Sequence, residues 1–107
     1  MFKLKDIKAN KGATLDKQGK ELHYTSGYQV SKCDLEVIPL YTLTKKHLIE
    51  MLNKIPNGAN LGIWIDNNKV YIDQSARISN KRLALKIGRE LNQIAIWDWK
   101  ASESIAC

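Results

Sequence analysis

Residues 61–73, LGIWIDNNKVYID, restrict the fold of this chain more than any other stretch. Two runs of strand-forming residues flank Asn67-Asn68, and asparagine tolerates the left-handed backbone that a two-residue hairpin turn requires. A turn there sets Ile65 opposite Val70, and this one pair decides the rest of the register because side chains alternate between faces. Four aliphatic residues then share one face and two aromatic residues the other: Ile63, Ile65, Val70 and Ile72 against Trp64 and Tyr71.

Two segments with the apolar spacing of helices lie before and after this hairpin. The first covers about residues 45–55, with Thr44 as its N-cap. The second follows Ser79 or Asn80 as its cap and runs to about Asn92. The residues predicted to face the core are Leu48, Met51, Leu52 and Ile55 in the first helix, and Leu83, Ile87 and Leu91 in the second.

Residues 35–40, LEVIPL, and 94–99, IAIWDW, have the composition of short strands. With them, residues 35–99 have the order β-α-β-β-α-β of a ferredoxin-like split βαβ fold. We therefore predict an α+β domain with an antiparallel sheet and two helices on one face. Pro39 cannot donate a ladder hydrogen bond and is unfavourable in a central first strand, so a sheet that uses residues 28–31 in that place is the alternative.

The first third of the chain is expected to extend this core. Residues 1–12 are basic and predict an edge strand or a mobile arm, and residues 13–24 predict a β-hairpin that turns at Gly19. We expect residues 1–34 to pack on a core of residues 35–107, forming one domain overall. The hairpin would cover the aromatic face of the sheet; an exposed face on which bases stack, as in RNA-recognition modules, is the alternative.

Charge is the second informative property of the chain. The net charge is +6 at pH 7 and the pI is about 9.4. Two clusters could attract phosphate groups or an acidic protein surface, although a merely solvated face is an equal alternative. They are Lys3, Lys5, Lys8, Lys11, Lys17 and Lys20 near the amino terminus, and Arg77, Lys81, Arg82, Lys86 and Arg89 around the second helix.

Both predicted helices begin with cations, which is unusual. Lys45, Lys46 and His47 open the first helix, and Lys81-Arg82 opens the second. Positive charge at a helix amino terminus opposes the macrodipole by about a few tenths of a kcal/mol per group. Free N–H groups beside cations can hold an anion, so each start is a candidate site for phosphate or a partner carboxylate. Because antiparallel helices place these starts at opposite ends, an extended backbone or a protein surface is the expected partner.

The chain carries no motif of a known catalytic or metal centre. His23 and His47 are isolated in the sequence, and Cys33 and Cys107 form no metal-binding pair. We predict a non-enzymatic protein without cofactor or metal and with reduced thiols, an intermolecular bridge through Cys107 being the alternative. No apolar run is long enough to span a membrane and no signal peptide is apparent, so we expect a cytoplasmic protein that does not bind membranes.

A resemblance adds to this picture. LGIWID, KVYID-x-S, ALKIGRELNQ and AIWDW between residues 61 and 99 resemble a family of small, largely uncharacterised proteins of bacteriophages, prophages and conjugative elements. With GYQVS and the helix after it, the resemblance covers about residues 12–99. It implies a mobile-element protein that inhibits a host defence complex, regulates host machinery or assists DNA handling. The family supplies no catalytic residues to transfer.

The preferred hypothesis is a non-enzymatic inhibitor of a host defence complex in the bacterial cytosol, similar to small anti-CRISPR proteins, with a type II effector nuclease as the first candidate. A nucleic-acid-binding accessory protein that contacts DNA or RNA directly is the first alternative. A self-associating module, monomer or homodimer, that uses Trp64 and Tyr71 is the second. The residues predicted to bind the partner or nucleic acid are Arg77, Lys81, Arg82, Lys86, Arg89, Lys45 and Lys46.

Overall fold

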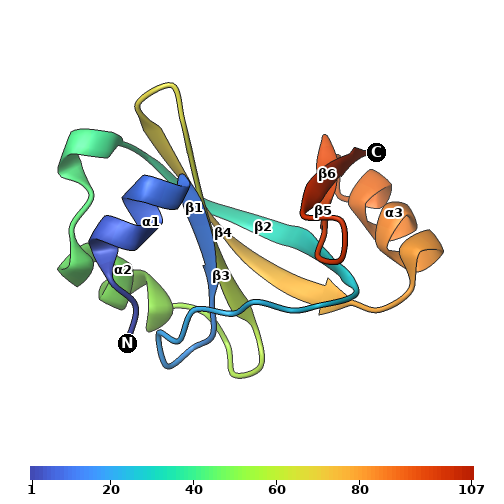
Figure 1. The fold of residues 1–107 in the computed structure, drawn as a ribbon, viewed down its shortest axis with the longest axis horizontal. Helices are drawn as coiled ribbons and strands as arrows, with labels where there is room; N and C mark the ends of the chain where they lie inside the picture. Colours follow the sequence, from blue (N-terminus) through green and yellow to red (C-terminus); the bar gives the residue numbers. More distant parts are fainter.

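The computed structural model describes all 107 residues, and it is built around one six-stranded antiparallel sheet (Figure 1). The strands lie in the order β1-β3-β4-β2-β5-β6, and three α-helices and a short 3-10 turn, Leu40–Thr42, complete the fold. The predicted α+β class is therefore confirmed. The helices are α1 (Leu4–Asn10), α2 (Lys45–Leu52) and α3 (Lys81–Glu90), and the strands are β1 (Gly12–Leu15), β2 (Tyr28–Pro39), β3 (Asn60–Asp66), β4 (Lys69–Ile78), β5 (Ala95–Asp98) and β6 (Glu103–Ala106).

The central hairpin has the predicted register. Ile65 pairs with Val70 and Trp64 with Tyr71, and Asn67 and Asn68 have φ angles of 49° and 61°. Two consecutive left-handed residues define the turn whose twist matches that of the flanking strands. All four aliphatic residues of the predicted apolar face are buried, so this face forms the centre of the main core.

The amino-terminal segment differs from the prediction. Residues 4–10 form the helix α1 rather than an edge strand or a mobile arm, and Ile7 and Phe2 are buried in the main core. Apolar residues at positions 4 and 7 are three apart, which suits one face of a helix as well as it suits an irregular strand. The helix ends where Lys11 adopts a left-handed conformation, with φ of 59°.

After α1 the chain adds a strand to the sheet edge and does not cover the aromatic face. β1 pairs with β3 from Gly12 opposite Trp64 to Leu15 opposite Leu61. The predicted hairpin of residues 13–24 is reduced to a single bridge between Leu15 and Glu21. The expectation that it buries the aromatic face is wrong, because Trp64 is 57% exposed.

β2 joins the two segments that sequence analysis treats as alternatives for one central strand. It runs from Tyr28 to Pro39, and Pro39 is its last residue, where the missing N–H interrupts no further pairing. Its register against β4 shifts twice, between Ser31 and Cys33 and between Asp34 and Glu36. Such bulges increase the local twist and bend the strand, which accounts for a curled sheet. The boundary expected after residue 34 falls inside this strand.

The curled sheet carries two separate cores. The main core joins α1 and α2 to β1, β3 and β4, and a smaller core joins α3 to the other end of the sheet through Val30, Ala84 and Ile96. Figure 1 shows α1 and α2 at one end of the molecule and α3 with β5 and β6 at the other. Side chains between the two ends are therefore available to line a groove.

Helix α2 starts where predicted but ends at Leu52 rather than at about residue 55, so Ile55 is buried just beyond it. Helix α3 packs partly with a different face, although Ile87 lies against the smaller core as expected. Leu83 and Leu91, expected to be buried, are 48% and 39% exposed, while Ala84 and Gly88 are buried. A Cβ at Gly88 would lie 3.1 Å from Ile96 Cγ2 and 2.9 Å from Cys107 Sγ. Small residues thus allow the helix to approach β5 and the terminal residue closely, and this turns Leu83 and Leu91 outward.

Candidate functional site

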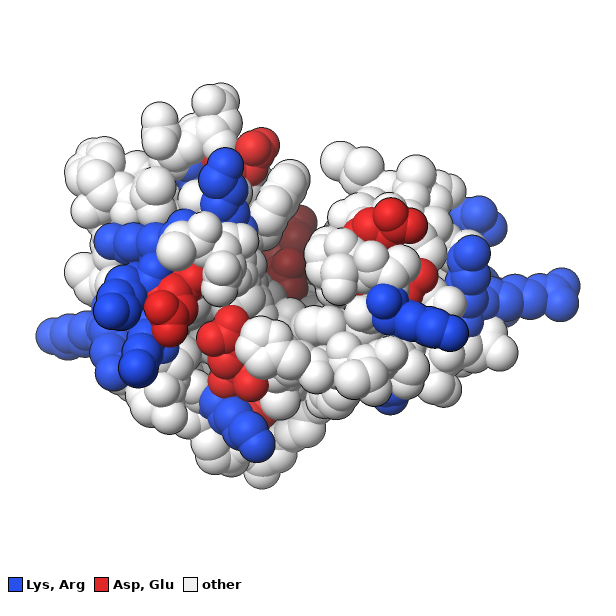
Figure 2. All heavy atoms as spheres, in the orientation of Figure 1, with Lys and Arg blue, Asp and Glu red and all other residues white.

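A groove of about 630 Å³ lies between the two halves of the molecule. β1 and β3 contribute to one wall, β5 to the other, and β2 and β4 to the base. Figure 2 shows the surface hollowed between these halves. The lining includes three tryptophans and several polar side chains of the central strands: Trp64, Trp97, Trp99, Gln29, Ser31, Asp73 and Ser75. Concave sites with apolar walls and a few polar groups are typical of ligand binding.

Asp73 is the most unusual polar residue of the groove. The pKa of its carboxyl is raised from 3.8 to about 6, chiefly by burial and also by the nearby charge of Asp34, while the neighbouring Ser31 hydroxyl opposes the rise. Asp73 Oδ1 and Ser31 Oγ are both buried without a hydrogen-bond partner. Gly62 is the cross-strand partner of Asp73, and a Cβ at position 62 would collide with the carboxylate. The glycine therefore makes room for this carboxylate beside the neighbouring strand.

One wall of the groove is held rigidly by a buried hydrogen-bond network. Trp99 Nε1 donates to Gln29 Oε1 at 3.1 Å, and Gln29 Nε2 donates to Asn60 Oδ1 and Ser75 Oγ, each at 2.9 Å. Trp97 packs edge-on against Trp99 with ring centroids 6.4 Å apart. A network in which every polar side chain has a hydrogen-bond partner orders those side chains. The Trp99 indole is therefore held in place, and Trp97 packs against it.

The opposite wall carries the predicted aromatic pair. Trp64 and Tyr71 lie side by side with ring centroids 5.3 Å apart, as their cross-strand register requires. Trp64 also lines the groove. Sequence analysis identified this pair but missed Asp73 and Gln29. The alternation Asp73, Ser75, Arg77 on one face of β4 was the available signal, since polar residues at every second position indicate a face outside the apolar core.

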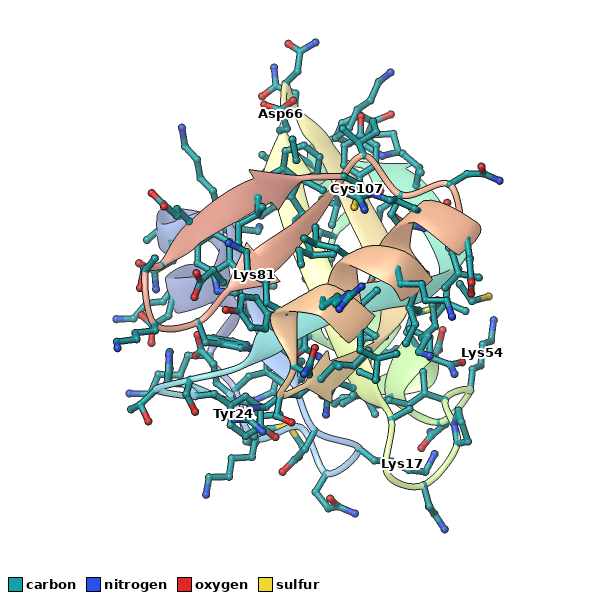
Figure 3. The ribbon with its side chains drawn as sticks, turned by 90° about the vertical axis from the view of Figure 1, so that its right-hand side faces the viewer. Lys17, Tyr24, Lys54, Asp66, Lys81 and Cys107 are labelled. Carbon is teal, nitrogen blue, oxygen red and sulfur yellow. The ribbon has the colours of Figure 1, made fainter.

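The predicted basic residues around α3 do not all have the same role. Arg77 lies over the Tyr24 ring at 4.9 Å and donates to Ser26 O at 2.9 Å, which ties down the segment before β2. Arg89 Nε donates to Cys107 O at 3.0 Å, and Figure 3 shows Cys107 beside α3. The three cations without a hydrogen bond or ion pair to the chain are Lys81, Arg82 and Lys86.

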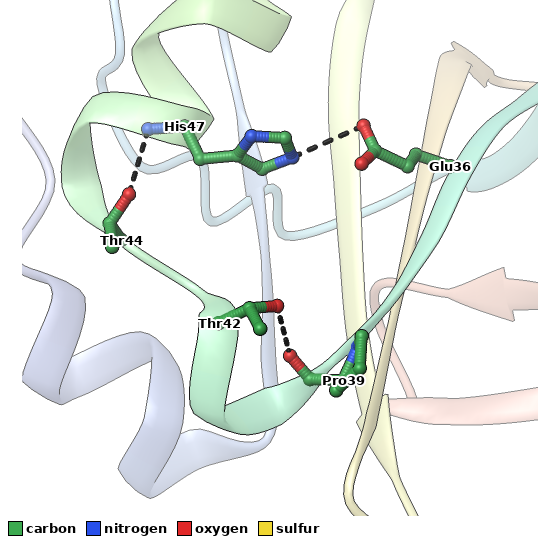
Figure 4. A network of polar contacts seen from close by, with 5 residues as sticks. All are labelled: Glu36, Pro39, Thr42, Thr44 and His47. Atoms are coloured by element: carbon green, nitrogen blue, oxygen red, sulfur yellow. Dashed lines mark hydrogen bonds and ion pairs between the residues drawn. The ribbon is translucent and has the colours of Figure 1, made fainter.

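The start of α2 is largely occupied by contacts within the chain. Thr44 Oγ1 accepts a hydrogen bond from His47 N, and His47 Nε2 lies 3.1 Å from Glu36 Oε2 (Figure 4). Lys45 Nζ lies 5.6 Å from the centre of the Phe2 ring. Of Lys45, Lys46 and His47, only Lys46 makes neither a hydrogen bond, an ion pair nor a contact with an aromatic ring through its side chain.

Positive charge is nevertheless uncompensated at both ends of the molecule. Both ion pairs in the structure involve histidines, and no lysine or arginine pairs with an aspartate or glutamate. Figure 2 shows Lys and Arg gathered over α1 and α2 at one end and over α3 at the other. The groove between them has the opposite character, because it contains Asp73 and Glu21.

No group of three His, Cys, Asp or Glu side chains could hold a metal ion. Both cysteines are free. None of the helices is long and apolar enough to cross a lipid bilayer. Comparison with protein-family models, with curated proteins and with solved structures finds no match to this chain. The resemblance to mobile-element proteins therefore stays a prediction that rests on the quoted residues.

Proposed function

We propose that this protein is a non-enzymatic inhibitor of a host defence ribonucleoprotein complex, with a type II CRISPR effector nuclease as the first candidate. The observation that carries the proposal is the absence of any ion pair between a lysine or arginine and an acidic side chain in a chain of net charge +6. Uncompensated positive surfaces attract polyanions such as RNA and DNA.

The positions of the two basic ends suit an extended partner. The molecule measures 36 × 28 × 23 Å along its principal axes, and the ends in Figure 2 lie apart along the longest one. A positive protein is a poor mimic of DNA, so the proposed mode is obstruction of the guide RNA, the target strand or an acidic surface of the effector. The resemblance to mobile-element proteins supplies the biological setting and, with it, a place in the host cytosol.

The finer fold assignment belongs to this proposal as well. Within the sheet, β5, β2, β4 and β3 are neighbours in that order, each pair antiparallel. This is the strand order of a split βαβ unit. We assign residues 28–98 to a ferredoxin-like core that β1 and β6 extend at its two edges.

Charge reversal on α3 tests the proposed function. Arg82→Glu combined with Lys86→Glu should abolish inhibition of plasmid interference by the effector, because both side chains are exposed and lack partners in the chain. Lys54→Glu combined with Lys69→Glu is the matched control, since it changes the charge equally at exposed positions away from α3. Full inhibition by the α3 variant, or none by the parent protein, would refute the proposal.

Direct nucleic-acid binding is the second candidate function, and the exposed Trp64 beside Tyr71 favours it. Aromatic rings on a sheet can stack bases, and cations at both ends can contact phosphates. The plasmid-interference assay separates the two functions, because only the inhibitor lowers interference; a gel shift with single-stranded RNA and DNA over a salt series then tests direct binding. An accessory protein should bind free nucleic acid with an affinity that falls steeply with salt. An inhibitor directed at the protein part of the complex should show little affinity for free RNA or DNA.

A further inference from the structure

The groove differs in charge from the rest of this basic molecule. Its lining carries the carboxylates of Asp73 and Glu21, and Lys11 is its only lysine or arginine. His23 also lines it and lies 3.7 Å from Glu21, which leaves Asp73 as the acid at the base without a cationic neighbour. A carboxylate in that position attracts a cation and repels an anion.

Two enclosed polar atoms at the base of the groove have no hydrogen-bond partner of normal geometry. Asp73 Oδ1 and Ser31 Oγ have no hydrogen-bond partner, although buried carboxylate oxygens in folded proteins are normally satisfied. Both residues line the groove, on neighbouring strands β4 and β2. Asp73 Oδ2 also makes no hydrogen bond within the chain but is not enclosed, so a ligand that supplies N–H donors can reach the carboxylate through this oxygen.

The walls favour a planar cation. Trp97 and Trp99 on one side and Trp64 on the other present indole rings to the groove, and indole is the aromatic group that attracts cations most strongly. A guanidinium is planar, stacks on aromatic faces and donates through several N–H groups. An ammonium is compact and more strongly hydrated. The combination of indole walls and an unpaired carboxylate therefore discriminates in favour of guanidinium.

We propose that the groove binds an arginine side chain of a partner protein, whose guanidinium stacks on an indole of the wall and donates to the carboxylate of Asp73. Because the groove opens to solvent between the two halves of the molecule, a side chain that projects from a protein surface can enter it (Figure 2). This site is independent of the basic ends on which the proposed function rests. A partner that presents both an anion and a nearby arginine would engage both.

Three short peptides test the proposal on the folded protein: acetyl-Gly-Arg-Gly-amide, its lysine counterpart and its citrulline counterpart. Binding is followed by the NMR resonances of the three indole N–H groups. The arginine peptide should shift them saturably. The citrulline peptide, which has the same shape without the charge, should bind about tenfold or more weakly, as expected for loss of a charge-assisted hydrogen bond. The affinity of the lysine peptide should lie between those of the arginine and citrulline peptides.

Asp73→Asn provides the variant arm, because it keeps the shape of the side chain and removes the charge. It should weaken the arginine peptide about tenfold or more, whereas Asp66→Asn, an equal charge change at the exposed hairpin turn, should have no effect. Equal binding of citrulline and arginine by the parent, unchanged binding by Asp73→Asn, or no shift at all would overturn the proposal. The peptide comparison needs no variant, so it stands even where a substitution perturbs folding. The peptide titration contains no nuclease and no nucleic acid, so its outcome is independent of the inhibition assay.

Discussion

Asp34 and Asp73 are direct cross-strand partners in β2 and β4. Like charges in this position disfavour the sheet, and the charge of Asp34 adds to burial in raising the pKa of Asp73 to about 6. This like-charge repulsion therefore opposes ionisation of Asp73 in the folded chain. Its position at the base of an aromatic groove suits the arginine-binding role that we propose for this groove.

Replacing Asp73 by Asn should stabilise the protein at neutral pH. The folded-state pKa lies about two units above the ordinary value of 3.8, so the folded protein holds the proton more tightly than the unfolded chain. Stability from this group is therefore present below pH 4 and is lost as pH rises through 6, by up to about 3 kcal/mol. Urea denaturation from pH 4 to 7.5 should show the variant more stable at pH 7 and equal to the parent near pH 4. Asp66→Asn serves as the control, and equal stability of parent and Asp73→Asn at pH 7 would contradict the expectation.

Gly62→Ala should destabilise the hairpin by about 1–3 kcal/mol, because the new Cβ collides with the Asp73 carboxylate. Thermal unfolding measures the loss. The same change in an Asp73→Ala background should be much less costly, since the colliding atoms are gone and the two effects are coupled. Additive losses in the double variant would show that the two side chains do not interact.

Ala84→Leu in α3 should cost about 1–3 kcal/mol, whereas Leu83→Ala should cost less than about 1 kcal/mol. Ala84 is fully buried against Val30 and Ile96, and Leu83 is about half exposed. Denaturant midpoints of the two variants measure the difference. The reverse order of stability would mean that α3 presents its leucine face to the sheet after all.

Gln29→Leu should destabilise the protein by about 2–3 kcal/mol, because it leaves the Trp99 N–H and the side chains of Asn60 and Ser75 without partners in a buried site. Tryptophan emission should also shift to the red as Trp99 becomes mobile and hydrated. Gln18→Leu is the control at an exposed glutamine. An unchanged emission spectrum together with unchanged stability would mean that the network does not hold the indole.

The turn and the helix starts could be predicted from the sequence, because each depends on residues that are close together in the chain. The register of the 61–73 hairpin follows from two asparagines that accept left-handed backbone, and the helix starts follow from Thr44 and Asn80, whose side chains accept hydrogen bonds from His47 N and Leu83 N. In each case one or two neighbouring residues decide the conformation, because the partners lie within a few positions in the chain.

The sequence could not predict which residues line the groove, because they are not neighbours in the chain. Gln29, Asp73 and Trp99 lie far apart in the chain and meet only through strand order. The same holds for α3, where periodicity favours the leucines, but contact with Ile96 selects the smaller residues Ala84 and Gly88.

The sequence by itself determined the hairpin, the two capped helix starts, the α+β class and the net positive charge. The tertiary structure alone decided that residues 4–10 are helical, that β1 joins the sheet edge and leaves Trp64 exposed, and that Asp73 Oδ1 is enclosed without a hydrogen-bond partner. The physical reason is the range of the interactions: caps and turns are satisfied by near neighbours, whereas burial depends on which distant segments the curled sheet brings into contact.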